Sequence, residues 1–259
     1  MPDGFSLDFN HGAMKPVDDP RSRDISDRLN AHIDAALFRA RSEEAKREYV
    51  GASAIGNECL RAVQFNYAGV EPDDGRITGR LLRIFDTGHH FEDIVAGWLR
   101  LAGFELDTID PATGRQFGFA QLSGKAKGHL DGILRGGPLP MDYPCVWECK
   151  ALNEKGWQEV KKNGLRLAKP IYAAQVAVNQ AYQGLTVPAV FTVLNKNTSE
   201  LHHELVPFDR ELAQASSDDF VEVIQATEDQ RLLPRPYNSP DFYKCKMCDF
   251  AKTCWKLPK

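Results

Sequence analysis

The segments Gly128-His-Leu-Asp-Gly-Ile-Leu134 and Val146-Trp-Glu-Cys-Lys150 are predicted to form two strands around which the rest of the chain is organised. Both are rich in apolar residues and are bounded by turn-forming Gly, Ser and Pro residues. Because side chains alternate along a strand, Glu148 and Lys150 share one face. Asp131, from the other segment, can join them, so two carboxylates and an ammonium group can meet in one pocket.

These three side chains suit the hydrolysis of a phosphate ester. Carboxylate oxygens bind hard cations such as Mg²⁺ and Mn²⁺, and a lysine beside them can orient or help to activate a water. The alternative without catalytic function is a surface ion pair, which is the usual role of a Glu-x-Lys sequence on a strand. Asp131, sixteen intervening residues and then Glu148-Cys149-Lys150 resemble the PD-(D/E)XK nuclease superfamily.

The composition is that of an ordinary globular protein, with 259 residues, 42% hydrophobic and 26% charged. No apolar run approaches the roughly 18 residues that span a membrane, and no signal-peptide core is present, so we expect a cytoplasmic protein without a membrane partner. The net charge of −4 gives no global attraction to nucleic acid. Binding to DNA would therefore need a local basic patch.

The chain is expected to consist of a mobile N-terminal arm, residues 1–24, and a single PD-(D/E)XK nuclease domain, residues 25–259. The arm is polar and shows no periodicity. Apolar periodicity predicts a packing helix from Ser26 to Val50 and a second helix over residues 77–102, broken near Thr87-Gly88.

A basic stretch directly follows the second predicted strand. Its cations are candidates for phosphate contacts, although a basic cluster more often forms a solvated face. Residues 115–135 are expected to form a hairpin that adds one more cation beside Asp131, and Pro170 is expected to start a helix. The candidate DNA-binding residues are Lys127, Lys155, Lys161, Lys162, Arg166 and Tyr172.

The predicted helix over residues 77–102 contains a motif that resembles RecB-type nucleases. In that family the helix before the catalytic strands carries Gly-x-x-x-His or Gly-x-x-x-Glu, and its last residue reaches the metal. Gly88-His-His-Phe-Glu92 matches the Glu form. The resemblance implies Glu92 as a metal ligand together with Asp131 and Glu148, with one of the two histidines inside the match as the alternative.

The helix after Pro170 carries a second motif of this kind. Gln175-Val-Ala-Val-Asn179 is similar to the Gln-x-x-x-Tyr signature of RecB-type nucleases, but has Asn in the Tyr position. The resemblance implies that Gln175 acts in catalysis beside Asp131, Glu148 and Lys150. Residues three and four apart on a helix share a face, so Asn179 lies on the same side as Gln175.

Three of the six cysteines have the spacing of a metal centre, and Cys59, the one thiol not otherwise assigned, is expected to complete it. Two others, Cys145 and Cys149, have strand parity opposite Glu148 and are expected to be buried. In the C-terminal part, Cys-x-x-Cys is followed by five residues and another Cys, a metal-binding pattern that needs one more ligand. Four thiolates suit either Zn²⁺ or an iron–sulfur cluster, and disulfides are not expected in a cytoplasmic chain. The proposed ligands are Cys59, Cys245, Cys248 and Cys254.

One Cys before a RecB-type core and three after it resemble the iron–sulfur nucleases. These include AddB-type recombination nucleases, CRISPR-associated exonucleases of the adaptation machinery and their phage-encoded relatives. The resemblance runs from about Ser53 to Trp255. It implies an α/β, restriction-endonuclease-like core, with a mixed central sheet flanked by helices. A [4Fe–4S] cluster, or Zn²⁺ as the alternative, would clasp the N- and C-terminal parts of the domain together.

The function implied by this resemblance is a Mg²⁺- or Mn²⁺-dependent DNA exonuclease that acts on single-stranded ends. Its further partners would be other DNA-processing or CRISPR adaptation proteins. One alternative is a non-catalytic DNA-binding or assembly subunit, against which the intact Asp131, Glu148 and Lys150 argue. The other is a metal-dependent endonuclease, although nothing in the chain resembles a dedicated base-reading module.

Overall fold

The computed structural model divides the chain into two compact units, residues 1–44 and 45–259. The residues that the structure describes are 20–45, 47–73 and 75–258. The division therefore falls at residue 44, whereas the sequence placed the end of an N-terminal arm at residue 24. Residues 1–19 of the expected arm lie outside the described residues.

Helix α1 (Pro20–Glu43) lies in the first unit. It begins before Ser26, the expected start, because proline fits the first turn of a helix, where its missing N–H is not needed. It also ends before Val50, which instead begins the short strand β1 (Val50–Gly51). The residues from Pro20 to Asp24 are thus helical, and the expected boundary between arm and domain at residue 24 stays a prediction.

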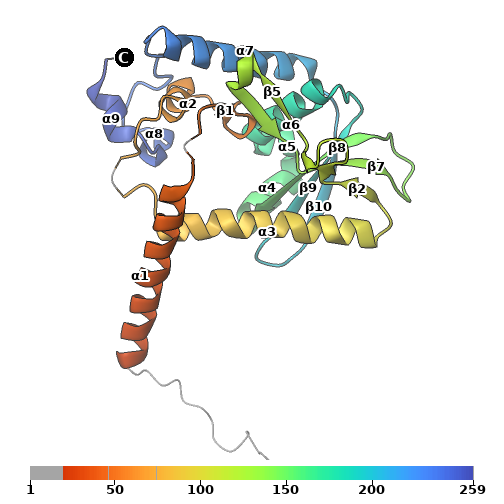
Figure 1. The fold of residues 1–259 in the computed structure, drawn as a ribbon, viewed down its shortest axis with the longest axis horizontal. Helices are drawn as coiled ribbons and strands as arrows, with labels where there is room; N and C mark the ends of the chain where they lie inside the picture. Colours follow the sequence, from red (N-terminus) through yellow and green to blue (C-terminus); the bar gives the residue numbers. More distant parts are fainter. Residues whose placement is uncertain (1–19, 46, 74, 259) are drawn as a thin grey trace, which may run out of the picture. The chain divides into compact units, whose positions relative to one another are not determined.

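A five-stranded sheet forms the centre of the second unit (Figure 1). Its order is β10 (Leu201–Val206), β9 (Ala189–Asn195), β8 (Cys145–Leu152), β7 (Gly132–Gly136) and β2 (Glu105–Asp107). Strands β8 and β9 are parallel and the other neighbours are antiparallel. The expected mixed sheet flanked by helices is therefore present.

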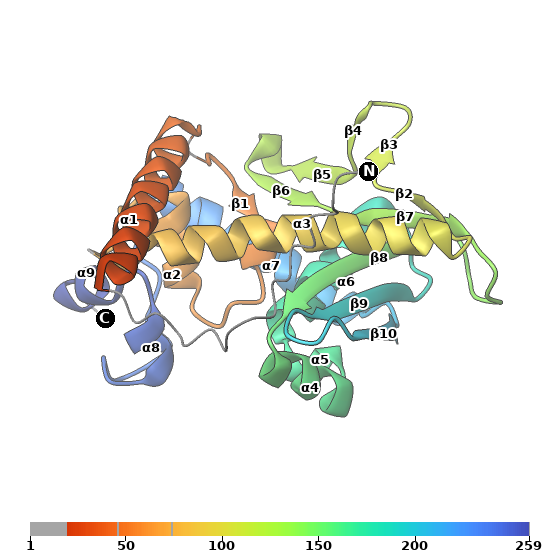
Figure 2. The same cartoon turned by 90° about the horizontal axis from the view of Figure 1, so that it is seen from below.

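Helices cover both faces of β8 and β9, which explains the nearly continuous apolar character of these two strands. On one face, Trp147 and Cys149 pack with Val95 of α3 (Gly79–Leu101). On the other face, Val146 packs with Val176 of α6 (Pro170–Gln183). Helix α7 (Arg210–Glu228) lies beyond α6, and α3 runs along the sheet (Figures 1 and 2).

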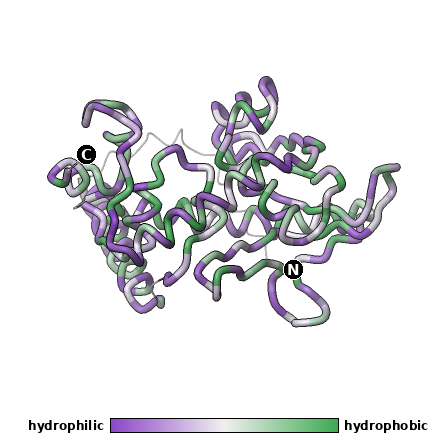
Figure 3. Tube along the Cα trace, turned by 90° about the horizontal axis from the view of Figure 1, so that it is seen from above, coloured by the Kyte–Doolittle hydropathy of each residue, from purple (hydrophilic) through white to green (hydrophobic). Residues whose placement is uncertain are grey.

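Helix α3 is continuous, so the expected break near Thr87-Gly88 is absent. The helix begins after Thr78, whose side-chain oxygen accepts a hydrogen bond from the backbone N–H of Leu81 at 3.2 Å. One glycine in a helix costs about 1 kcal/mol, which the packing of the apolar face against the sheet outweighs. Hydrophilic and hydrophobic residues alternate repeatedly along the helices, as amphipathic packing requires (Figure 3).

A smaller sheet has the order β1, β6 (Ala126–His129) and β5 (Gly118–Gln121). The expected hairpin within residues 115–135 is confirmed, because β5 and β6 are antiparallel. The segment from Gly128 to Leu134, however, is not one strand. It ends β6 in the smaller sheet and begins β7 in the larger one, so Asp131 lies where the chain crosses between the sheets.

The remaining elements are short helices and one further pair of strands. They are η1 (Ala52–Ala54), α2 (Leu60–Tyr67), β3 (Ile109–Asp110), β4 (Arg115–Gln116), η2 (Leu122–Gly124), α4 (Glu154–Asn163), α5 (Leu165–Ala168), α8 (Tyr243–Met247) and α9 (Ala251–Lys256). In the part of the chain that the structure describes, no helix has the length and apolar character needed to cross a membrane.

Gly132, directly after Asp131, is a packing requirement of this crossing. A Cβ at this position would lie 2.7 Å from Leu106 Cδ1 and 2.9 Å from the Asp107 carbonyl oxygen, both of the neighbouring strand β2. We expect Gly132→Ala to lower the free energy of unfolding by about 1–3 kcal/mol, because overpacking forces the backbone to move. Urea denaturation measures the change.

Gly97→Ala in α3 is the matched control for this prediction. A Cβ there meets nothing within 4 Å. Alanine is also the better helix former by about 1 kcal/mol, so the control should be as stable as the parent protein or more so. Equal unfolding curves for Gly132→Ala and the parent protein would contradict the packing explanation.

Candidate active site

Asp131, Glu148 and Lys150 meet at the start of β7. The register pairs Gly132 with Trp147, so continuing it by one residue places Asp131 opposite Glu148. Asp131 Oδ2 accepts a hydrogen bond from the backbone N–H of Cys149 at 2.8 Å, which fixes the carboxylate against β8. Lys150 Nζ lies 2.5 Å from Glu148 Oε1 and 3.6 Å from Asp131 Oδ2. The ammonium group therefore bridges the two carboxylates.

Glu148 is completely buried, and helix α6 satisfies its carboxylate. Gln175 Nε2 donates to Glu148 Oε1 at 2.7 Å, and Asn179 Nδ2 donates to Glu148 Oε2 at 3.3 Å. The two amides lie one helical turn apart, which brings both onto the face of α6 that packs on the sheet. Asn179 Nδ2 also lies 3.3 Å from the carbonyl oxygen of His129, and so connects α6 to both carboxylate-bearing segments.

The electrostatics of the site favour a bound cation. Burial, and next the charge of Asp131, raise the pKa of Glu148 to about 8. Burial and then Asp131 also raise the pKa of Glu92, whose carboxylate lies 3.6 Å from His89 Nδ1. Burial acts to lower the pKa of Lys150, but the charges of Glu148 and Asp131 overcome it and raise that pKa. A bound divalent cation would favour the ionised forms of Glu148 and Glu92 and so lower both pKa values.

The donor set fits a hard cation, although the side chains are not arranged as a finished metal site. Among the described residues, no group of three or more His, Cys, Asp or Glu side chains is placed so that it could hold a metal ion. Lys150 stands between Asp131 and Glu148, where its charge offsets their repulsion. Gln175 Oε1 and Asn179 Oδ1 are buried without a hydrogen-bond partner. Carboxylate and amide oxygens of this kind are ligands of hard cations or of the waters around them.

The candidate DNA-binding residues are placed in separate surroundings. Tyr172 is near the site, with Lys150 Nζ 5.8 Å from its ring centre. Lys127 Nζ lies 4.8 Å from the ring centre of Tyr49, and Arg166 forms an ion pair of 3.6 Å with Asp209. The three remaining cations, Lys155, Lys161 and Lys162, are on the exposed side of α4. None of the five basic residues forms an ion pair with the candidate site within the described chain.

The four cysteines of the expected metal centre lie at the beginning of α2 and in or beside α8 and α9, elements that are near one another (Figure 1). The four thiols interact electrostatically, but among the described residues no three of them are placed so that they could hold a metal ion. Burial raises the pKa of the Cys59 thiol, and Cys254 and Cys245 raise it further. Burial likewise raises the pKa of Cys248, with added contributions from Cys59 and Cys254. All four are free thiols, whereas Cys145 and Cys149 are buried on β8 as expected.

A buried arginine beside these thiols supports an anionic centre. The Arg61 side chain is 0% exposed, and its guanidinium donates to the carbonyl oxygens of Leu233 and Pro258. Its Nη1 lies 3.9 Å from Cys254 Sγ, and its Nη2 is buried without a partner. No carboxylate pairs with it among the residues described, so an unpaired buried charge would be costly. Thiolates bound to a metal would supply the missing negative charge.

Two of these roles are not predicted by the sequence. The sequence places Asn179 on the same face as Gln175, but its hydrogen bond to Glu148 follows from the packing of α6 on β8. Arg61 lies in the first turn of α2, two residues after Cys59, but its partners Leu233 and Pro258 are far away in the sequence. The spacing of Gln175 and Asn179 was a usable signal for the first role, whereas no local signal indicates the second.

Comparisons with known proteins give distant likenesses. No protein-family model matches the sequence, and no curated protein matches it. The solved structure of SSO0001 has 16% sequence identity and a TM-score of 0.47, and covers 89% of this chain and 96% of that one. An alkaline exonuclease (LHK-Exo) from Laribacter hongkongensis has 12% identity and a TM-score of 0.49, covering 76% and 93%. LHK-Exo in complex with dAMP has 13% identity and a TM-score of 0.43, covering 71% and 89%. At these values the likenesses assign no function to this chain.

The dependence of Glu148 on its amide donors can be measured with Gln175→Glu. The change replaces a donor to a buried carboxylate by a second carboxylate. We expect the free energy of unfolding without divalent ions to fall by about 1–3 kcal/mol or more, because a buried charged group loses its partner.

Gln158→Glu is the matched control on the exposed face of α4. Gln158 Nε2 donates to Glu154 Oε1 at 2.9 Å, in the same kind of hydrogen bond as Gln175, but in solvent. Its replacement should cost only about 0.2–0.5 kcal/mol. Similar losses for both variants in urea denaturation would show that Glu148 does not depend on Gln175.

Proposed function

We propose that this chain is a divalent-metal-dependent deoxyribonuclease that hydrolyses phosphodiester bonds. The convergence of Asp131, Glu148 and Lys150 beside the amide groups of α6 is the observation that supports it. Asp131, Glu148 and Glu92 would hold Mg²⁺ or Mn²⁺. When bound, the ion supplies Lewis-acid neutralisation of the phosphate charge.

The side chains of the protein would position the attacking water, the phosphate and the carboxylates. Lys150 is 18% exposed and, as an ammonium group, can only donate hydrogen bonds. It is therefore suited to hold the oxygen of an attacking water and to face a phosphate oxygen. Gln175 and Asn179 keep the Glu148 carboxylate in one orientation, and the backbone N–H of Cys149 does the same for Asp131. The acids are thus positioned before the substrate binds.

The finer form of the proposal is an exonuclease that acts on ends of single-stranded DNA. Its support is the order of motifs along the chain: Gly88 to Glu92, Asp131, Glu148-x-Lys150 and Gln175, in the order found in RecB-type nucleases. Neither the end requirement nor the strand preference follows from the geometry of the carboxylates, so each needs its own measurement.

Digestion of end-labelled DNA tests the activity. The parent protein should cut with Mg²⁺ or Mn²⁺ and not with EDTA. Glu148→Gln and Lys150→Met should each lose about 100-fold or more in rate, because each removes charge stabilisation at the reacting phosphate. Glu105→Gln on β2 is the control, since it neutralises an exposed carboxylate of the same sheet and should cut like the parent protein.

The substrates distinguish the finer alternatives. Exonuclease action predicts rapid loss of linear single strands and a stable single-stranded circle, whereas rapid cutting of the circle would show an endonuclease. DNA binding without cutting under any metal condition would show a binding subunit. Equal rates for Glu148→Gln, Lys150→Met and the parent protein would refute the catalytic assignment.

We also propose that Cys59, Cys245, Cys248 and Cys254 hold one [4Fe–4S] cluster. Their mutual proximity and the buried, unpaired Arg61 support a negatively charged tetrathiolate centre. Zn²⁺ is the alternative, because it accepts the same four ligands. In either case the centre would join segments far apart in the sequence and stabilise the folded state alone.

Anaerobic purification and metal analysis test this centre. The parent protein should be brown and carry about four iron atoms per chain, the content of one such cluster. Cys59→Ala should lose the metal and unfold at a lower temperature. Cys145→Ala, which removes a buried thiol of β8, should keep the metal. Colourless protein with stoichiometric zinc would replace the cluster by zinc, and metal retention in Cys59→Ala would refute the ligand set.

A further inference from the structure

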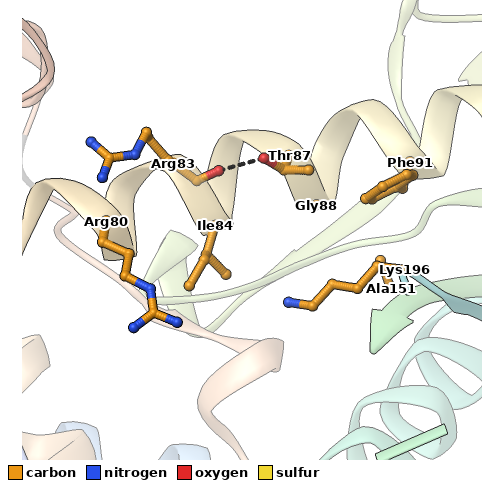
Figure 4. Close-up of a pocket in the computed structure, with 8 residues that line it drawn as sticks. All are labelled: Arg80, Arg83, Ile84, Thr87, Gly88, Phe91, Ala151 and Lys196. Carbon is orange, nitrogen blue, oxygen red and sulfur yellow. Dashed lines mark hydrogen bonds between the residues drawn. The ribbon is translucent and has the colours of Figure 1, made fainter. Parts of the chain in front are cut away.

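A cavity with cationic walls borders the candidate active site on the α3 side of the sheet. Its volume is about 240 Å³, much larger than the roughly 30 Å³ of one water. The residues that line it are Arg80, Arg83, Ile84, Thr87, Gly88 and Phe91 of α3, Ala151 of β8, and Lys196 directly after β9 (Figure 4). Three of the lining residues carry a positive charge and none carries a negative charge.

Two of the cations reach into the space beside α3. Figure 4 shows the head groups of Arg80 and Lys196 on the same side of the helix, with Ile84 between them, whereas the Arg83 guanidinium points to the other side. Arg80 and Lys196 are both exposed. Neither forms an ion pair within the described residues, unlike Arg166, which pairs with Asp209. The charges of Arg80 and Lys196 are therefore available to a ligand.

The cavity and the candidate site share two elements, β8 and α3. Ala151 directly follows Lys150 on β8, and Phe91 directly precedes Glu92 on α3. Because side chains alternate along a strand, Ala151 lies on the α3 face of β8 and Lys150 on the opposite face. The connection therefore runs along α3, where Glu92 interacts electrostatically with Asp131 and Lys150 and directly follows Phe91 of the cavity wall.

We propose that this cavity binds a phosphate group of the substrate strand next to the phosphate that is cleaved, through Arg80 and Lys196. The proposal rests on the proposed function and adds to it a binding subsite. Guanidinium and ammonium groups without an acidic partner are suited to phosphate oxygens. Ile84 and Phe91 provide apolar surface for the sugar or base. Such contacts position a strand without reading its sequence.

Gly88 lines the cavity and contributes no side chain to it. A Cβ built at this position meets nothing within 4 Å, so a large side chain has room there beside the ligand space. This glycine therefore offers a way to block the cavity while both cations remain. The proposed subsite places the DNA strand on the α3 side of β8, whereas the basic residues predicted from the sequence to bind DNA lie mainly on α4.

Binding of DNA without cleavage tests the subsite. The probe is a short fluorescent oligothymidine in EDTA, and anisotropy measures Kd over a range of salt concentrations. In the double variant Arg80→Ala/Lys196→Ala, Kd should rise about tenfold or more, because hydrogen bonds to charged groups are lost. The salt dependence should become shallower by about 0.7 log units per log unit of salt for each lost phosphate contact.

Two further variants test whether the loss of binding is specific to the cavity. Gly88→Leu should also weaken binding, since it fills the cavity, but it should keep the salt dependence closer to that of the parent protein because both cations remain. Arg115→Ala/Lys256→Ala removes the same charge from β4 and α9, and neither residue lines the cavity. This control should bind as the parent protein does. If it weakens binding as much as Arg80→Ala/Lys196→Ala, or if the latter binds normally, the proposal is overturned.

Four DNA substrates distinguish a backbone phosphate from a terminal phosphate as the group bound in the cavity. They are a 5′-phosphorylated strand, a 3′-phosphorylated strand, a strand with two hydroxyl ends, and a single-stranded circle. A defect of the double variant on all four indicates a backbone phosphate, and a defect on one phosphorylated strand alone indicates a terminal phosphate. Cavity-dependent binding in a protein that never cuts would refute the nuclease and leave the subsite. If the parent protein cuts DNA and the cavity variants bind DNA as tightly as it does, the subsite is refuted and the nuclease proposal stands.

Discussion

The burial of the Glu148 carboxylate in the middle of the central sheet is the constraint on which the candidate site depends. A buried carboxylate without partners would be strongly destabilising, so each neighbouring element has to provide a donor. Strand β8 itself provides Lys150, and α6 provides Gln175 and Asn179. The apolar face of α6 determines that the helix packs on the sheet. The two amides determine the rotation and the position along β8 at which it does so.

This arrangement of buried charged and polar groups lowers the stability of the folded protein. Asp131 and Glu92 add negative charge next to a buried acid whose pKa is already raised, and burial is the largest cause in both glutamates. Two amide oxygens beside Glu148 remain without hydrogen bonds. A site selected for stability alone would have replaced such groups by apolar ones. The cation and the charged substrate proposed above would satisfy these groups.

The second structural constraint is the junction of α2 with the C-terminal segment. Gln64 donates to the carbonyl oxygen of Arg231 and accepts from the N–H of Leu233, and the Phe65 ring meets Phe250 edge-on at 5.6 Å. Asp73 accepts hydrogen bonds from the N–H groups of Lys252 and Thr253. These contacts join the two segments that carry the four cysteines. A bound centre would add charge compensation for Arg61 to a junction that packing already forms.

Features that depend on local periodicity and spacing could be predicted from the amino-acid sequence. Alternation along β8 placed Glu148 and Lys150 on one face, the spacing of Gln175 and Asn179 placed both on one face of α6, and the cysteine spacing indicated one centre. The tertiary structure alone decided what depends on packing between distant segments. It made α3 continuous because the sheet holds the helix across Gly88, and it set Asp131 at a crossing between two sheets. It also placed Arg61 beside the thiols, and Arg80 and Lys196 around one cavity. Local sequence carries no signal for such pairs, because each partner is brought into place by hydrophobic burial and hydrogen bonds elsewhere in the chain.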